Sequence, residues 1–306
     1  MTQEAYVEHI RKYLDPKTVA SLAGLGLQAR TVVEGYLSGM HRSPYHGVSV
    51  EFVQHREYVP GDDIRHVDWK VWSRTDKYYL KQYEEETNLR AYFWLDCSES
   101  MSYSSGPISK FQYARLVVAA LSYLVLQQQD SAGLVLFDES VRQYVRASNQ
   151  PSHIKQLLHV LESAEPSGKT KLGTCFHELA ERLEGRSLVI VVSDFFGDVD
   201  DILSGVQHLR HKRHDVIAMQ IVDGAEVDFP FRDSTLFEGM EELPDVLTDP
   251  RALRAAYQRE FHGFLRRLER GCRSRGVDYV LIRTDSLLDK ALSAYLAARN
   301  RRLQRR

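Results

Sequence analysis

The stretch of sequence that decides the fold is Tyr92-Phe93-Trp94-Leu95-Asp96-Cys97-Ser98-Glu99-Ser100-Met101. Its four leading apolar residues predict a strand that is buried on both faces. The strand stops at Asp96, and because Ser98 and Ser100 follow at alternate positions, an extended segment places all three oxygen-bearing side chains on one side. Such a set suits a hard divalent cation such as Mg²⁺, which prefers oxygen ligands at about 2.1 Å in octahedral geometry. The alternative is a strand that ends in an ordinary Asx or Ser turn.

The downstream sequence alternates between apolar strands and helical patterns. We expect further buried strands at 132–137, 188–192, 216–222 and 277–282, and helices at 109–128, 152–162, 174–184, 200–211 and 249–275. This alternation predicts an α/β fold with a doubly wound, mostly parallel sheet. We also expect an antiparallel edge strand at 141–145 and a looser insertion at 223–249 that contains a short strand, 235–237.

Oxygen-bearing side chains recur at two other strand–helix junctions. Asp194 follows the strand at 188–192, and the loop at 167–174 contains Thr170 and Thr174. In doubly wound sheets, ligands bind beyond the carboxyl ends of the strands, near the point where the strand order reverses. Three loops are therefore expected to bring Asp96, Ser98, Ser100, a threonine of the second loop and Asp194 to one metal site.

Composition argues against several classes of protein. The chain of 306 residues has 40 basic and 42 acidic side chains and a formal charge of −2, which gives no field suited to nucleic acid or an acidic membrane. Its three cysteines are far apart, as in proteins of a reducing compartment. The longest nearly apolar run, 116–126, is shorter than the roughly 20 residues that span a bilayer. We therefore expect a cytoplasmic protein that does not bind nucleic acid and does not insert into a membrane.

The chain upstream of residue 91 predicts a separate N-terminal α+β extension, residues 1–90, ahead of a main domain at 91–306. We expect a helix at 16–40 and strands at 48–54 and 78–83. The segment REYVPGDDIRHVDW (residues 56–69) predicts a turn and a short helix, capped by Asp62 or Asp63, that carries Ile64, Val67 and Trp69-Lys70-Val71-Trp72 toward a core. This segment is either a scaffold or a partner-docking surface, the latter formed by Arg56, Asp62, Asp63, Arg65, Asp68, Trp69 and Arg74.

Two motifs resemble known families. The DxSxS run at Asp96–Ser100, a threonine in a second loop and an aspartate in a third resemble the metal-ion-dependent adhesion site (MIDAS) of the von Willebrand factor A fold, over about residues 91–285. The longer signature at 56–69, followed by SRT at 73–75, resembles the domain-of-unknown-function 58 (DUF58) family, which couples this segment to a von Willebrand A-like domain. The resemblance implies that the ligands of Mg²⁺, or of Mn²⁺ or Ca²⁺ in its place, are Asp96, Ser98, Ser100, Thr170 and Asp194. Thr174 is the alternative to Thr170 in the second loop, and Asp194 acts commonly through water.

The resemblance implies a protein-interaction module rather than an enzyme. A partner carboxylate would fill the open position of the metal, and the protein would act as an adaptor or chaperone-like partner of a MoxR-type AAA+ ATPase. The alternative is a metal-dependent hydrolase acting on phosphoesters, which requires a second metal or a base. For that role the sequence offers His208, His211 and His214, although these also suit the end of a helix. The basic tail at 299–306 is expected to be solvated.

Overall fold

The computed structural model describes residues 50–58, 67–75, 77–85, 89–150, 152–241 and 244–286. These residues fall into two compact units, 50–85 and 89–286. Several predicted features lie outside the described residues: the helix at 16–40, the turn at Pro60-Gly61, the residues Asp62, Asp63 and Arg65, and the basic tail.

The smaller unit is a two-stranded ribbon with one helix. The two predicted strands are present as β1 (Val50–Glu57) and β2 (Tyr79–Glu85), which pair antiparallel, and α3 spans Trp69–Thr75. The described helix starts directly after Asp68, whose Oδ1 accepts a hydrogen bond from the Val71 N–H at 3.3 Å. Asp68 therefore caps the first turn of this helix, while the predicted caps, Asp62 and Asp63, lie outside the described residues.

Of the side chains predicted to point into a core, Val67 is buried as expected, but the indoles of Trp69 and Trp72 are not. The side chains of Trp69 and Trp72 are 56% and 37% exposed. The two strands and one short helix in the described part of this unit enclose too little volume for them, so the rings pack on one another. Trp69 lies edge-on to Trp72 at 6.0 Å between centroids, and Trp72 stacks on Tyr78 at 6.0 Å.

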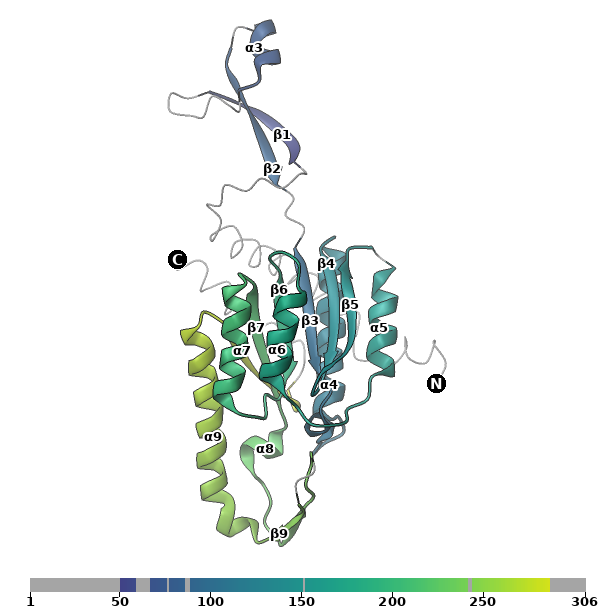
Figure 1. The fold of residues 1–306 in the computed structure, drawn as a ribbon, viewed down its shortest axis with the longest axis vertical. Helices are drawn as coiled ribbons and strands as arrows, with labels where there is room; N and C mark the ends of the chain where they lie inside the picture. Colours follow the sequence, from purple (N-terminus) through teal and green to yellow (C-terminus); the bar gives the residue numbers. More distant parts are fainter. Residues whose placement is uncertain are drawn as a thin grey trace. The chain divides into compact units, whose positions relative to one another are not determined.

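The larger unit contains a six-stranded sheet with the order β10-β7-β6-β3-β4-β5 (Figure 1). Its strands are β3 (Arg90–Asp96), β4 (Ser131–Phe137), β5 (Val141–Ser148), β6 (Leu188–Ser193), β7 (Asp215–Val222) and β10 (Asp278–Arg283). All neighbours pair in parallel except β4 and β5. If these six strands are numbered 1 to 6 along the chain and read from the β5 edge, their order is 3-2-1-4-5-6, which is the order of a doubly wound sheet. The predicted fold class is confirmed, and the strand order reverses between β3 and β6.

The helices connecting these strands follow the sequence pattern closely. They are α4 (Lys110–Gln127), α5 (His153–Ser163), α6 (Leu172–Arg182), α7 (Val199–His211) and α9 (Pro250–Ser274). Ser109 caps α4 through a capping box with Gln112, and Asp249 caps α9 ahead of a proline at the first helical position. Helix α6 begins two residues earlier than predicted, because the Cys175 N–H already donates to the Lys171 carbonyl oxygen.

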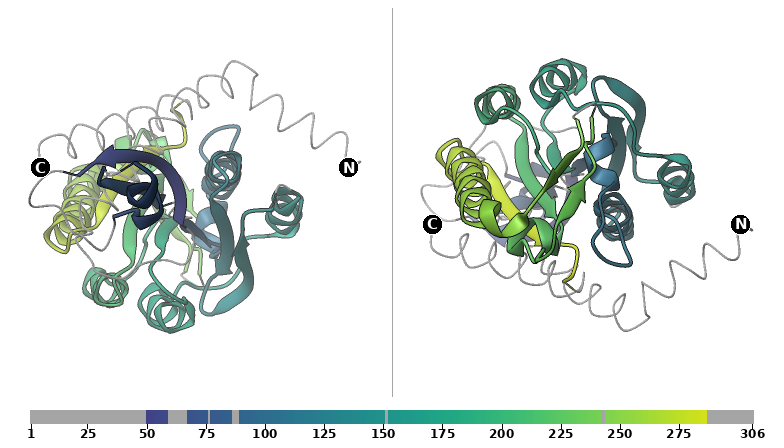
Figure 2. Two further views of the ribbon diagram at one scale, coloured as in Figure 1. Left: turned by 90° about the horizontal axis from the view of Figure 1, so that it is seen from above. Right: turned by 90° about the horizontal axis from the view of Figure 1, so that it is seen from below.

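Helices cover both faces of the sheet (Figures 1 and 2). Tyr92 and Trp94 of β3 belong to a core cluster to which α6, α7 and α9 contribute apolar side chains. Phe93 and Leu95 alternate with them and face the opposite side, where α4 contacts four strands of the sheet. Since both faces are buried, the side chains of β3 from Ala91 onward are shielded from solvent.

The carboxyl edge of the sheet carries the predicted insertion. It contains the short helix α8 (Gly224–Asp228) and a separate ribbon of β8 (Thr235–Phe237) and β9 (Val246–Thr248). The predicted strand at 235–237 is therefore confirmed. In Figure 1, α8 and β9 lie beyond the carboxyl ends of the parallel strands.

No helix in the described ranges has both the length and the apolar character needed to cross a bilayer. The cytoplasmic location stays a prediction.

Candidate functional site

The candidate site lies at the switch point of the sheet. Asp96 is the last residue of β3, and Asp194 directly follows β6. Both carboxylates are completely buried. This is the place at which the topology of a doubly wound sheet opens a crevice between the loops that leave its strands in opposite directions.

Asp96 is held by hydrogen bonds on both carboxylate oxygens. Its Oδ1 accepts from the Ser98 N–H at 2.9 Å, and its Oδ2 accepts from the Ser193 hydroxyl at 2.5 Å. Burial, followed by the charge of Asp194, raises the pKa of Asp96 from 3.8 to about 7, and the hydrogen bonds oppose that rise. A bound cation would favour the ionised form, which burial disfavours.

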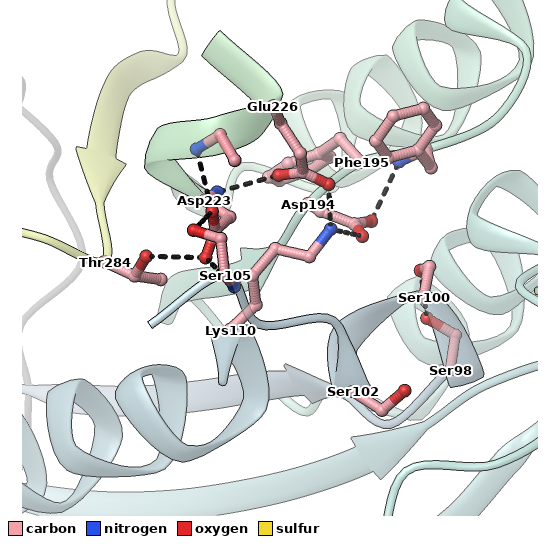
Figure 3. A network of polar contacts seen from close by, with 12 residues as sticks. Ser98, Ser100, Ser102, Ser105, Lys110, Asp194, Phe195, Asp223, Glu226 and Thr284 are labelled. Atoms are coloured by element: carbon pink, nitrogen blue, oxygen red, sulfur yellow. Dashed lines mark hydrogen bonds and ion pairs between the residues drawn. The ribbon is translucent and has the colours of Figure 1, made fainter. Parts of the chain in front are cut away.

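The hydroxyls predicted for the first loop lie beside one another. Ser98 Oγ and Ser100 Oγ are 3.1 Å apart, and a 3-10 turn over Glu99–Ser102 (η2) follows the strand (Figure 3). Ser98 is fully buried, so its hydroxyl has little water to bond with. Each oxygen keeps lone pairs available for a ligand.

The second loop is joined to the first by backbone hydrogen bonds. The Ser167 N–H donates to the Cys97 carbonyl oxygen at 2.8 Å, and the Glu99 N–H donates to the Gly168 carbonyl oxygen at 2.9 Å. Gly168 has φ of +74°, a conformation that glycine adopts without strain. The two loops therefore approach the site as one unit.

Thr170 is the better placed of the two candidate threonines. Its Oγ1 is buried and has no hydrogen-bond partner among the described residues, whereas Thr174 lies exposed on the first turn of α6. An unpartnered buried hydroxyl is uncommon, because a lost hydrogen bond destabilises the fold. Thr170 is thus the residue of the second loop that a ligand would satisfy.

Asp194 is neutralised by a lysine that the sequence analysis missed. Lys110 Nζ lies 2.8 Å from Asp194 Oδ2 and 2.7 Å from Glu226 Oε1, and its side chain is 1% exposed (Figure 3). The two carboxylates raise the pKa of Lys110 although burial acts to lower it. The remaining oxygen, Asp194 Oδ1, accepts from the Phe196 N–H at 3.0 Å.

The acid that completes this ion pair belongs to a second polar cluster. Asp223 and Glu226 form the capping box of α8, and Asp223 also accepts hydrogen bonds from Ser105 and from Thr284, which follows β10 (Figure 3). Burial raises the pKa of Glu226. The cluster fixes the insertion to the carboxyl edge of the sheet.

A further carboxylate reaches the site from the insertion. Glu241 follows β8, and its N–H donates to Glu99 Oε2 at 2.8 Å. Burial raises the pKa of Glu241, while hydrogen bonding from the Ser100 side chain and the Thr170 backbone opposes the rise. Its Oε1 is buried and has no hydrogen-bond partner among the described residues. Because it lies in an irregular segment, the sequence carries no signal that would have found it.

The donor set is dominated by hydroxyls rather than by charged ligands. In the described part of the chain, no group of three or more His, Cys, Asp or Glu side chains gathers in a way that could hold a metal ion. The site instead offers Asp96 with the hydroxyls of Ser98, Ser100 and Thr170. The unpartnered Thr170 hydroxyl and this oxygen chemistry fit a hard divalent cation.

The residues predicted for partner docking are only partly described. Asp68 is buried, Trp69 is exposed, and Arg74 lies exposed at the end of α3. Arg56 lies within β1. Their role in docking stays a prediction.

These features define a doubly wound α/β protein with an oxygen-lined site at its switch point. The model of the family described as "Protein of unknown function DUF58" matches residues 54–263, which is more than half of the chain. The protein belongs to this family, and the family predicted from the signature at 56–69 is confirmed.

The similar curated proteins span nearly the whole chain. Uncharacterized protein Rv1480 of Mycobacterium tuberculosis is 25% identical over 294 residues, which cover 94% of this chain and 91% of that protein. Uncharacterized protein Mb1516 of Mycobacterium bovis shows the same identity and coverage.

Among solved structures, the conserved hypothetical protein BatB from Bacteroides thetaiotaomicron has 15% identity and a TM-score of 0.47, covering 70% of this chain and 99% of its own. The SpRpn10 VWA domain has 13% identity and a TM-score of 0.40, covering 68% and 95%.

Proposed function

We propose that this protein is a metal-dependent protein-interaction module. Asp96, Ser98, Ser100 and Thr170 bind Mg²⁺, or Mn²⁺ or Ca²⁺ in its place, and Asp194 supports the cation through water. When bound, the cation supplies an electrophilic centre with an open position for a carboxylate of a partner protein.

The observation that carries this proposal is the convergence of three loops on one buried point. The loop after β3 is bonded to the loop at 167–170 through backbone atoms, and to the end of β6 through the hydrogen bond between Ser193 and Asp96. The unpartnered Thr170 hydroxyl lies in this assembly. A site with one available carboxylate and several neutral oxygens leaves much of a cation's charge for an outside ligand.

Lys110 supports the same conclusion. Because its ammonium group neutralises Asp194, that carboxylate contributes little negative charge to a cation at Asp96. We therefore expect modest affinity for the cation alone and stronger retention once a partner carboxylate adds its charge. This cooperativity suits an interaction site better than a permanently loaded structural metal.

The family supports a proposal for the partner. Since the chain belongs to the DUF58 family, we infer that it works with a MoxR-type AAA+ ATPase as an adaptor or chaperone-like component. The hydrolase alternative finds no comparable support. Of the histidines that it would use, His208 bonds to His177 at 2.7 Å between Nδ1 atoms and pairs with Glu181, across α6 and α7.

The test is a calorimetric titration with Mg²⁺, with and without the AAA+ protein, on the wild type and on Asp96→Ala and Asp96→Asn. Asp233→Ala is the matched control, since its side chain is 96% exposed. We expect both Asp96 variants to lose Mg²⁺ binding and Mg²⁺-dependent complex formation, and the control to keep both. Binding that survives in the folded Asp96 variants would refute the proposal.

A further inference from the structure

The insertion between β7 and α9 places a carboxylate of the protein itself at the candidate cation site. Glu241 is anchored by its main chain, whose N–H donates to Glu99 Oε2 at 2.8 Å on the turn that carries Ser100. Its φ of +55° is a conformation that few non-glycine residues adopt, and it turns the chain sharply at this point. The backbone thus directs Glu241 to the first metal loop.

The side chain of Glu241 contacts the same groups that would bind the cation. It interacts with the Ser100 side chain and the Thr170 backbone, one from each of the first two loops. Both its Oε1 and the Thr170 Oγ1 are buried without a hydrogen-bond partner among the described residues. Each of these buried oxygens lacks the partner that a bound cation would supply.

We propose that Glu241 is an internal ligand of the cation and occupies the position that a partner carboxylate takes when the partner binds. This inference rests on the proposed function. The insertion then acts as an intramolecular competitor: it completes the site in the free protein and must be displaced before a partner's acidic residue can reach the metal.

The ribbon that precedes and follows the chain around Glu241 is suited to displacement. Strands β8 and β9 pair over three residues each, and among the described residues this ribbon hydrogen-bonds to no strand of the main sheet. Two-stranded ribbons of this size are marginally stable by themselves, and this one packs through Phe237 on Phe229 and Phe231 of the insertion. Leu236 and Leu247 are also exposed on it, at 53% and 73%. Lifting the segment leaves the six-stranded sheet and its core intact.

The experiment compares Glu241→Gln with Glu238→Gln, an exposed glutamate of the same segment that serves as the control. Calorimetry measures the affinity for Mg²⁺. Fluorescence anisotropy then measures Mg²⁺-dependent binding of a labelled peptide that carries one glutamate between glycines, with its glutamine counterpart as the blank. Asp96→Ala is measured alongside, because it tests the site itself.

We expect Glu241→Gln to bind Mg²⁺ about tenfold more weakly, since affinity for hard cations follows the number of charged ligands. At saturating Mg²⁺ it should bind the acidic peptide about tenfold more tightly, because a tethered competitor has been removed. Glu238→Gln should change neither value. If Asp96→Ala abolishes binding while Glu241→Gln matches the wild type in both assays, this inference is wrong and the proposed function stands. If the wild type binds no Mg²⁺, both are wrong.

Discussion

Replacing Lys110 by methionine tests the electrostatics of the site most severely. The ammonium group lies 2.8 Å from Asp194 Oδ2 and 2.7 Å from Glu226 Oε1, and the side chains of these acids are 0% and 13% exposed. Methionine keeps most of the length and apolar character of the lysine stem but removes its charge. Two carboxylates then face one another without a cation.

Removing one partner of a buried ion pair destabilises a protein by about 3–5 kcal/mol. Part of this loss is recovered when one carboxyl takes up a proton, and burial already raises the pKa of Glu226. The folded variant therefore binds more protons than its unfolded chain at neutral pH, so its stability deficit must grow as the pH rises. We expect a deficit of about 3–5 kcal/mol at pH 8 and a smaller one at pH 5.5.

The assay is urea unfolding at both pH values without divalent cations, with Lys155→Met on the exposed face of α5 as the control. Freeing Asp194 should also tighten Mg²⁺ binding, so saturating Mg²⁺ should restore more stability to the Lys110 variant than to the wild type. A deficit below about 1 kcal/mol, or one that does not depend on pH, would refute the electrostatic reasoning.

Two further predictions concern pH and packing. The pKa of Asp96 is about 7 in the folded protein, against 3.8 for the ordinary carboxyl. Its neutral form therefore contributes stability to the cation-free protein that is fully present below pH 3.8 and is lost as the pH rises through 7. One pKa unit corresponds to about 1.4 kcal/mol. The free energy of unfolding of the wild type minus that of Asp96→Asn, measured in chelator, should fall by up to about 4 kcal/mol from pH 4 to pH 8; a constant difference would contradict the assigned burial. In α9, a Cβ at Gly271 would clash with Leu203 Cδ1, while one at Gly263 meets nothing within 4 Å. Chemical denaturation should show Gly271→Ala destabilised by about 1–3 kcal/mol and Gly263→Ala stabilised by about 0.5–1 kcal/mol; equal effects would mean that α7 and α9 do not pack this closely.

Local sequence patterns predicted the fold well because the strands are buried on both faces. A strand such as Leu188–Ser193 reads as a continuous apolar run, and the acids after it and after β3 mark where burial ends. Strand order could not be read directly, yet short connections and right-handed crossovers leave few arrangements. The positions of Asp96 and Asp194 at one edge follow from that topology.

The charges that tune the site could not be predicted, because they depend on distant parts of the chain. Lys110 stands directly after a helix cap, where a lysine is ordinarily solvated, and its partners lie 84 and 116 residues away. Glu241 belongs to an irregular segment without periodicity, so no pattern places it. The exposure of Trp69 was mispredicted because hydrophobic character alone does not show whether a unit has enough volume to bury an indole.

The direct measurement is anomalous diffraction from crystals grown with Mn²⁺ as a stand-in for Mg²⁺. A cation bound as proposed gives one strong peak within coordination distance of Asp96, Ser98 and Ser100, with Thr170 or Glu241 completing the ligands and Lys110 still paired with Asp194. The absence of a peak at this edge of the sheet at saturating Mn²⁺, or a peak held by other side chains, would contradict a metal-dependent interaction site.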